Sequence, residues 1–143
     1  MENSIQLTIE SLKTQYEQIS IESVDDLIQL YSPNACFKDP FNFVFGRDAI
    51  KHIFLTMFEQ VDSPQFVIRE VIQQESSACL LWEFKFRFKR WDTSEKSLTG
   101  VSWLHFDQHN LVSSHNDYWD HAEGIYEHLP LIGSLMRGLK KLA

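Results

Sequence analysis

The sequence predicts an α+β domain in which N-terminal helices cover one face of a curved, mainly antiparallel, cone-shaped sheet. Apolar residues first recur at intervals of three and four, and from about residue 65 to residue 120 they recur at intervals of two. Polar turns separate the period-two runs, which is typical of an antiparallel meander. With 143 residues, 43% of them hydrophobic, the chain has enough material for one domain over residues 1–143.

Three helices are predicted in the first half of the chain. The first carries an apolar stripe formed by Ile5, Ile9, Leu12, Tyr16 and Ile19. The second begins near Ser23, which stands three residues before Asp26 as in a capping arrangement, and runs to Pro33. The third runs from Arg47 until Pro64 ends it.

Strands are expected between and after these helices. A brief strand covers 35–40 and ends at an Asp-Pro step, and a loop follows over 41–46. Four strands then follow in the runs 65–73, 78–91, 96–106 and 110–120. Residues 122–143 return to helical spacing, with Pro130 and Gly133 as expected kinks, and form a helical C-terminal extension.

The predicted strand 78–91 has one aromatic face. Trp82, Phe84, Phe86 and Phe88 point one way, and charged residues alternate with them. A concave sheet lined by such side chains and covered by helices either fills itself or encloses an apolar cavity. We therefore place Trp82 and Phe84 among the candidate ligand-binding residues.

The last predicted strand contains the strongest candidate site. Alternation puts His115, Asp117 and Trp119 on one face, so His115 and Asp117 are neighbours. On the preceding strand Trp103 and His105 share a face, and either is expected across from this pair, depending on register. A carboxylate beside an imidazole in an apolar site suits general acid–base catalysis. The alternative, which the sequence favours equally, is that His115 and Asp117 form a hydrogen-bonded pair with a purely structural role.

Two residues nearer the N-terminus join the candidates. Asp39 shares a face with Phe37, and Pro40 fixes where its carboxylate points; the alternative is a turn acid that caps the following loop. Tyr16 lies on the inward stripe of the first helix, where its hydroxyl reaches a cavity or it serves as a core residue.

Metal and cofactor sites are not predicted. His115, Asp117 and His121 lack the usual ligand spacing, and no cysteine stands with them. The sequence also has no nucleophile elbow and no glycine-rich phosphate loop.

Charge and composition limit the partners. The net charge of −7 argues against nucleic acid, which needs clustered Lys and Arg. No apolar run of transmembrane length and no secretory signal pattern is seen, so a cytoplasmic protein is predicted. Cys36 and Cys79 each stand in an apolar run and are expected as reduced thiols.

The order of motifs resembles the SnoaL-like branch of the nuclear transport factor 2-like superfamily over about residues 5–121. The segments that carry the resemblance are YSPNACFKDP, GRDAIKHIF and the closing DYWD. The resemblance implies a cone of curved sheet around an apolar pocket, and frequently a homodimer packed through the sheets.

The resemblance also implies roles for individual residues. Asp39 matches the general base of ketosteroid isomerases, and Tyr16 falls within a residue of their oxyanion-stabilising Tyr. Trp103 stands at the place of the partner acid, so steroid isomerisation is not expected. Asp117 matches the acid of limonene epoxide hydrolases, whose Arg-x-Asp pair is replaced here by Glu83-Phe84-Lys85. SnoaL-type cyclases pair a carboxylate with a His, as His105, His115 and Asp117 do approximately.

These observations predict a protein that binds a hydrophobic, oxygenated small molecule and acts on it without a cofactor, as an isomerase, cyclase or hydrolase. Asp117 is the expected acid–base residue, with His115 or His105 orienting it. The rival is a non-catalytic ligand-binding or interaction domain. The tail 122–143 is amphipathic and basic, so weak membrane contact stands as the alternative to docking on its own domain or dimer.

Overall fold

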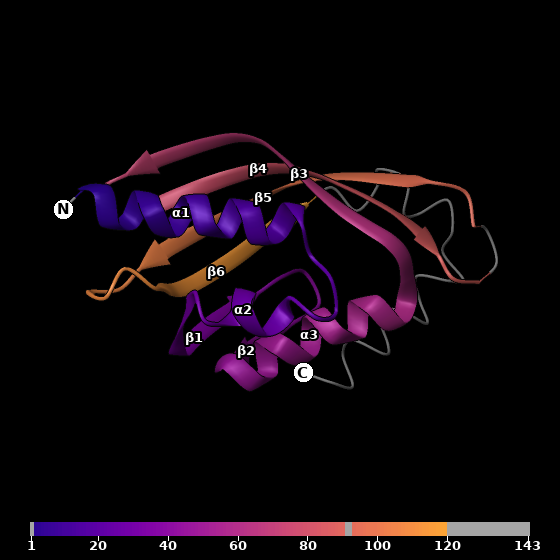
Figure 1. Cartoon of the computed structure of the whole chain (residues 1–143), viewed down its shortest axis with the longest axis horizontal. Helices are drawn as coiled ribbons and strands as arrows, with labels where there is room; N and C mark the ends of the chain where they lie inside the picture. Colours follow the sequence, from indigo (N-terminus) through magenta and orange to yellow (C-terminus); the bar gives the residue numbers. More distant parts are fainter. Residues whose placement is uncertain (1, 91–92, 120–143) are drawn as a thin grey trace.

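The computed structural model describes residues 2–90 and 93–119, and the predicted α+β class is confirmed (Figure 1). The helices are α1 (Glu2–Glu17), α2 (Val24–Ile28) and α3 (Arg47–Gln60). The strands are β1 (Tyr31–Lys38), β2 (Phe43–Phe45), β3 (Val61–Gln74), β4 (Ser77–Phe88), β5 (Lys96–Phe106) and β6 (Val112–Trp119).

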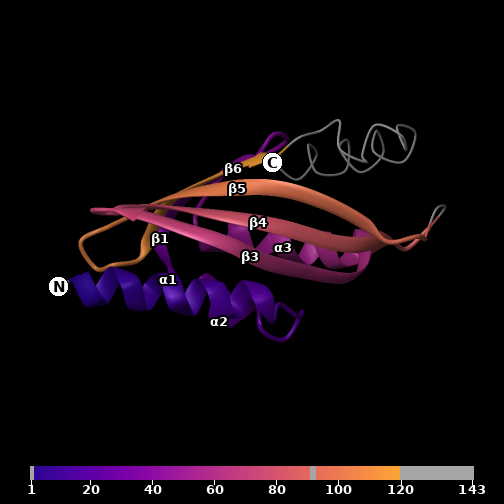
Figure 2. The same cartoon turned by 90° about the horizontal axis from the view of Figure 1, so that it is seen from above.

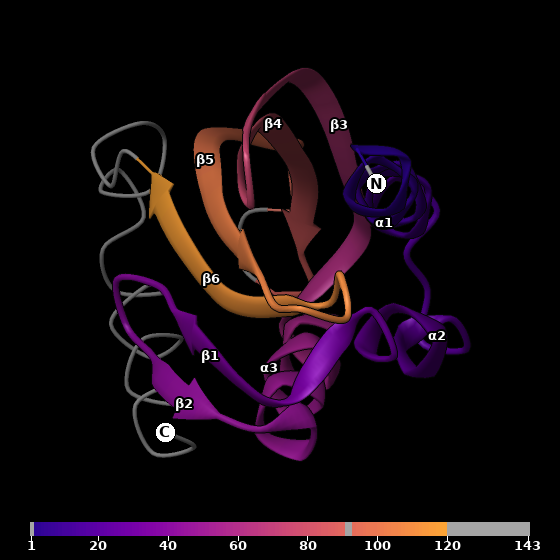
Figure 3. The same cartoon turned by 90° about the vertical axis from the view of Figure 1, so that its left-hand side faces the viewer.

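The strands form one curled sheet in the order β2-β1-β6-β5-β4-β3. Strands β3 to β6 are the predicted antiparallel meander. Strand β1 joins the other edge of β6 in parallel, with Phe37 beside His115, and β2 pairs antiparallel with β1. Figure 3 shows the strands following an open arc, with the helices across its open side. The parallel pairing brings the early strand against the last one.

Helices α1 and α3 cover the concave side because each presents an apolar stripe to it. Helix α1 packs on β3 through Ile9, Leu12 and Tyr16, which are buried (Figure 2). Helix α3 contacts both β1 and β3, and it buries Ile50 and Phe54. The core therefore lies between the helices and the inner face of the sheet.

Three predicted boundaries are corrected. Helix α2 ends at Ile28 instead of continuing to Pro33, and Tyr31 already belongs to β1. The predicted loop 41–46 contains β2, whose three residues are too few for periodicity to reveal. Helix α3 ends at Gln60, and Pro64 lies within β3, a strand at the edge of the sheet, next to a register shift. Edge strands and bulges are where a strand accepts proline.

The inner face of the sheet is aromatic, as predicted. Trp82, Phe86 and Phe88 of β4 are buried on it, and Gly100 of β5 lies opposite Trp82. A Cβ atom at Gly100 would lie 2.3 Å from the Trp82 ring and 2.8 Å from the Tyr118 carbonyl oxygen. The glycine therefore makes the room that the indole occupies.

The expected C-terminal helix 122–143 lies outside the described residues, as do Asp120 and His121. Within residues 2–90 and 93–119, no helix has the length and apolar character needed to cross a membrane.

Candidate functional site

An apolar cavity of about 170 Å³ lies between the inner face of the sheet and helix α3. Four of its seventeen lining residues are polar, namely Asp39, Asn42, Gln60 and Asp117. Nine are aromatic: Phe37, Phe41, Phe54, Phe66, Trp82, Phe84, Phe86, Phe88 and Trp119. A second cavity of about 30 Å³ has Tyr16, Ser102, His115 and Asp117 in its wall. Asp117 thus borders both spaces.

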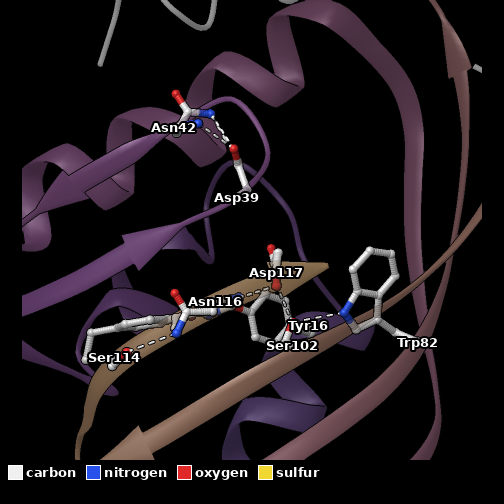
Figure 4. A network of polar contacts seen from close by, with 10 residues as sticks. Tyr16, Asp39, Asn42, Trp82, Ser102, Ser114, Asn116 and Asp117 are labelled. Carbon is white, nitrogen blue, oxygen red and sulfur yellow. Dashed lines mark hydrogen bonds and ion pairs between the residues drawn. The ribbon is translucent and has the colours of Figure 1, made fainter. Parts of the chain in front are cut away.

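Asp117 is held by two side chains on the inner face. His115 Nε2 lies 2.6 Å from Asp117 Oδ1, and the Ser102 hydroxyl donates to the same oxygen at 2.5 Å. The Trp82 indole N–H donates to Ser102 at 2.9 Å, as Figure 4 shows. Within the described residues, no group donates to Asp117 Oδ2. One carboxylate oxygen is therefore held by two side chains, and the other accepts no hydrogen bond from the described residues.

A chain of buried groups extends from His115 to helix α1. The Tyr31 hydroxyl lies 2.7 Å from His115 Nδ1, and the Tyr16 hydroxyl is hydrogen-bonded to the Tyr31 hydroxyl. His115 is 2% exposed, and its ring lies 4.5 Å from that of Phe37, centre to centre. The predicted neighbourhood of His115 and Asp117 is confirmed, and Tyr31 extends it.

Which group donates and which accepts in this chain of hydrogen bonds follows from the requirement that every buried donor has an acceptor. Tyr31 is the only hydrogen-bond partner of the Tyr16 hydroxyl among the described residues. If Tyr16 donates to Tyr31, Tyr31 donates to His115 Nδ1, and a neutral His115 donates from Nε2 to Asp117. A protonated His115 would donate from Nδ1 to the Tyr31 oxygen and leave one of the two tyrosine protons without an acceptor among the described residues, which is costly. The arrangement therefore favours a neutral imidazole beside an ionised Asp117.

The two tyrosines stay protonated donors. Burial raises the pKa of Tyr16 well above its ordinary value, and the nearby Tyr31 and Asp117 add to this electrostatically. Burial also raises the pKa of Tyr31, more than the hydrogen bond with Tyr16 lowers it. Neither hydroxyl can take up the role of a base at neutral pH.

Asp39 reaches the same cavity from the end of β1. Its Oδ1 accepts hydrogen bonds from the backbone N–H groups of Phe41 and Asn42, both at 2.7 Å. The Asn42 side chain donates to both carboxylate oxygens, as Figure 4 shows. Burial raises the pKa of Asp39, these hydrogen bonds oppose it, and the negative charge of Asp117 adds to the rise. Asp39 is thus a turn acid and a cavity residue at once.

The predicted placement of Trp103 and His105 is wrong. Both point to the outer face of β5, where Trp103 is 43% exposed and packs against His105. Leu104 lies opposite His115, and Ser102 lies opposite Asp117. The reason is an irregularity between the pairs Phe106–Val112 and His105–Ser114, which shifts the register by one residue and reverses the faces.

The other predicted residues lie where alternation put them. Trp82 borders both cavities, Phe84 and Trp119 line the larger one, and Tyr16 lines the smaller one. Their roles in binding stay predictions.

Sequence reasoning missed Tyr31 and Ser102. The helical spacing predicts Tyr31 in the second helix, whereas alternation with Ala35 and Phe37 places it on the inner face of β1, where it is buried. Ser102 alternates with Leu98, Gly100 and Leu104, which are all buried. The small residue at Gly100 was the available signal that this face meets the large Trp82.

No group of three or more His, Cys, Asp or Glu side chains in residues 2–90 and 93–119 is arranged to hold a metal ion. Cys36 and Cys79 are free thiols, each partly buried.

The family model of the SnoaL-like domain matches residues 13–115. The chain belongs to the SnoaL-like family. This places it in the nuclear transport factor 2-like superfamily, and the curled sheet with its helices on the concave side agrees with that membership. A comparison with curated proteins gives no match.

Solved structures share the SnoaL-like fold at low sequence identity. An NTF2-like protein of unknown function from Burkholderia pseudomallei superposes with a TM-score of 0.75 at 12% identity, covering 90% of this chain and 97% of that one. A protein from Shewanella denitrificans proposed to be a SnoaL-like polyketide cyclase gives 0.71 at 16% identity, with 88% and 96% covered. SalBIII, an epoxide hydrolase/cyclase-like enzyme in pyran ring formation in the polyether salinomycin, gives 0.72 at 12% identity, with 85% and 95% covered.

Proposed function

We propose that this SnoaL-like protein binds a small, hydrophobic, oxygen-bearing molecule in the larger cavity and transfers a proton to or from it without a cofactor. One observation carries the proposal. Asp117 borders an aromatic cavity with one carboxylate oxygen held by His115 and Ser102 and the other without a donor among the described residues. That is the arrangement of an oriented base with a free acceptor.

The proposed reaction begins with removal of a proton next to a carbonyl group. Asp117 Oδ2 takes the proton, the electrons of the broken C–H bond pass to the carbonyl oxygen as an enolate, and Asp117 returns the proton at another atom. The aromatic walls lower the polarity inside the cavity, which strengthens electrostatic interactions there. His115 orients Asp117. Tyr31 donates to His115 Nδ1 and so keeps the proton of the ring on Nε2. Asp39 supplies a second polar contact, and Tyr16 acts only through Tyr31.

The size of the cavity limits the substrate. Pockets for drug-sized ligands measure about 300–1,000 Å³, and this cavity measures about 170 Å³. An engineered cavity of about 150 Å³ holds benzene. We therefore propose a substrate of one or two rings. The likeness to SalBIII and to the Shewanella protein supports cyclisation as the class of reaction.

A non-catalytic binding protein is the second candidate. The hydrogen bonds that Asp39 accepts from its own loop favour it, because they explain that carboxylate without a reaction. A homodimer and a cytoplasmic location stay predictions from the sequence.

The test begins with a thermal denaturation screen against one-ring and two-ring carbonyl compounds and epoxides. Compounds that raise the melting temperature are incubated with the protein and analysed by mass spectrometry. A ligand at about 100 times its Kd stabilises the protein by about 2.7 kcal/mol, which is easily seen. A shift with a new product supports the enzyme, and shifts that never lead to a product support the binding protein.

For a substrate found in this way, Asp117→Asn should lower kcat by about 10²–10⁴-fold, because the amide keeps the shape of the side chain but does not accept the proton. Binding of a neutral substrate should persist. The matched control is His105→Ala on the outer face, which should leave kcat unchanged. An unchanged kcat in Asp117→Asn would contradict the assignment.

A further inference from the structure

The wall of the larger cavity contains acids but no bases. Asp39 and Asp117 both line it, and no Lys, Arg or His is among its lining residues. Neither carboxylate has a Lys or Arg partner within the described part of the chain, where the ion pair of Asp117 is with His115. The groups that donate to Asp39 are backbone and amide N–H groups, which are neutral.

The hydrogen-bond pattern favours an uncharged His115, which leaves the Asp117 carboxylate without a cationic partner. Among the described protein groups, the hydrogen-bond chain from Tyr16 through Tyr31 satisfies all its donors when His115 is neutral and donates from Nε2. The Asp117 charge is therefore balanced by dipoles and not by a cation. The neighbouring Asp39 experiences that charge, which helps to raise its pKa. A positive group in the cavity would relieve the repulsion between the two acids.

The rest of the wall also suits a positive charge. Nine aromatic residues surround the space, and the faces of aromatic rings attract cations, most strongly those of Trp. In a site that excludes water this attraction adds to the attraction of a nearby carboxylate. An anionic ligand would be repelled both by the two carboxylates and by the faces of the aromatic rings.

We propose that the ligand of this cavity is a hydrophobic cation, a protonated or quaternary amine carried on a small apolar ring or chain. The positive nitrogen lies near Asp117 and Asp39, and the apolar part contacts the aromatic wall. This inference rests on the proposed function in one respect, that the larger cavity is the ligand site. It adds a positively charged nitrogen to the oxygen-bearing substrate proposed above and makes no use of the catalytic step.

Two probes of the same shape separate charge from size. Benzyltrimethylammonium carries a permanent positive charge, and neopentylbenzene replaces its nitrogen by carbon. Binding of each to the full chain is measured by calorimetry and by the fluorescence of the tryptophans, two of which, Trp82 and Trp119, line the cavity. The measured quantity is the Kd of the neutral probe divided by the Kd of the cation.

The wild-type protein should bind the cation at least as tightly as the neutral probe. The ratio should fall about tenfold or more in Asp117→Asn, and by a smaller factor in Asp39→Asn, because each variant removes one carboxylate from the wall. Asp62→Asn is the matched control. Asp62 is exposed, follows the lining residue Val61 and does not itself line the cavity, so its ratio should equal that of the wild type.

Binding of the neutral probe without the cation would overturn this inference and leave the proposed function standing. An equal ratio in the wild type and Asp117→Asn would do the same. If neither probe nor any compound of the screen binds, the ligand site itself is wrong and both proposals fall. Should Asp117→Asn fail to fold, the wild-type ratio and Asp39→Asn still decide.

Discussion

Asp39 and Asp117 line one cavity and are held in contrasting ways. The Asp39 carboxylate accepts hydrogen bonds from residues two and three positions further along its own loop. Asp117 accepts from Ser102 on β5 and from His115, and His115 depends on Tyr31, 84 positions away in the sequence. One acid is placed by local chain geometry, and the other by the pairing of three strands.

The contrast indicates which of the two carboxylates is more easily displaced by substitutions elsewhere in the chain. A turn acid keeps its geometry as long as a few consecutive residues keep theirs. The position of Asp117 depends on the register of β5 and β6, on the parallel pairing with β1 and on the packing of Trp82. Substitutions far from Asp117 in the sequence should therefore disturb it, while leaving Asp39 in place.

The largest loss of stability is expected from Gly100→Ala. The new methyl group would lie 2.3 Å and 2.5 Å from atoms of the Trp82 ring, and moving that ring breaks its hydrogen bond to Ser102. Overpacking of this kind costs about 1–3 kcal/mol of the free energy of unfolding, and occasionally more. Urea denaturation measures the loss. The control is Thr99→Ala, whose side chain is exposed on the neighbouring position.

In the same variant, the backbone amide signals of Phe41 and Asn42 in NMR spectra should stay unchanged, since they report the Asp39 turn. Equal stability of Gly100→Ala and Thr99→Ala would show that the Trp82 position does not constrain this part of the sheet.

Tyr31→Phe should have an intermediate effect of about 1–2 kcal/mol on the free energy of unfolding. The change removes the acceptor of the buried Tyr16 hydroxyl and the donor to His115 Nδ1. It should also release the imidazole tautomer, which nitrogen chemical shifts of His115 report directly. Tyr118→Phe is the matched control, because Tyr118 is exposed and should stay within about 0.5 kcal/mol of the wild type.

A single unchanged tautomer of His115 in Tyr31→Phe would mean that Asp117 alone fixes the ring. The contrast between a locally and a remotely held carboxylate would then be weaker than the hydrogen bonds indicate.

The smallest effect is expected from Asp39→Asn and appears in the pH dependence of stability. The raised pKa of Asp39 means that the folded state holds this proton more tightly than the unfolded state. Stability therefore falls as the pH rises from the ordinary Asp pKa, about 4, through the raised value. Asn does not titrate, so the variant should lose less stability over the same range. Denaturation at a series of pH values measures the difference.

Asp62→Asn is the control for the loss of one carboxylate, because Asp62 is exposed and lies outside the cavity wall. A constant offset between Asp39→Asn and the wild type at every pH would contradict the raised pKa.

Local patterns in the sequence predicted the parts of the site that depend on local geometry. Alternation placed Phe84 and Trp119 on the cavity wall and set His115 next to Asp117. The Asp-Pro step placed Asp39 at the end of a strand whose inner face carries Phe37. Each of these follows from a period of two within one strand.

The other parts of the site depend on how the strands pair and in which register. If the pairing of Phe106 with Val112 continued without a break, Trp103 would lie opposite His115, as one of the predicted registers required. The shift between His105 and Phe106 sets Leu104 there instead. No pattern within β5 or β6 reveals such a bulge, because both faces of β5 carry apolar or aromatic residues. The pairing of β1 with β6 was equally out of reach, since it joins segments far apart in the chain.

The parallel contact of β1 with β6 also orders events during synthesis. When Tyr31, Phe37 and Asp39 leave the ribosome, the strand that completes their surroundings has not yet been made. The aromatic side chains in the first third of the chain therefore stay exposed to solvent until nearly all the described residues have emerged. Such distant closures are slow, so the pairing of β1 with β6 is expected to form late in folding.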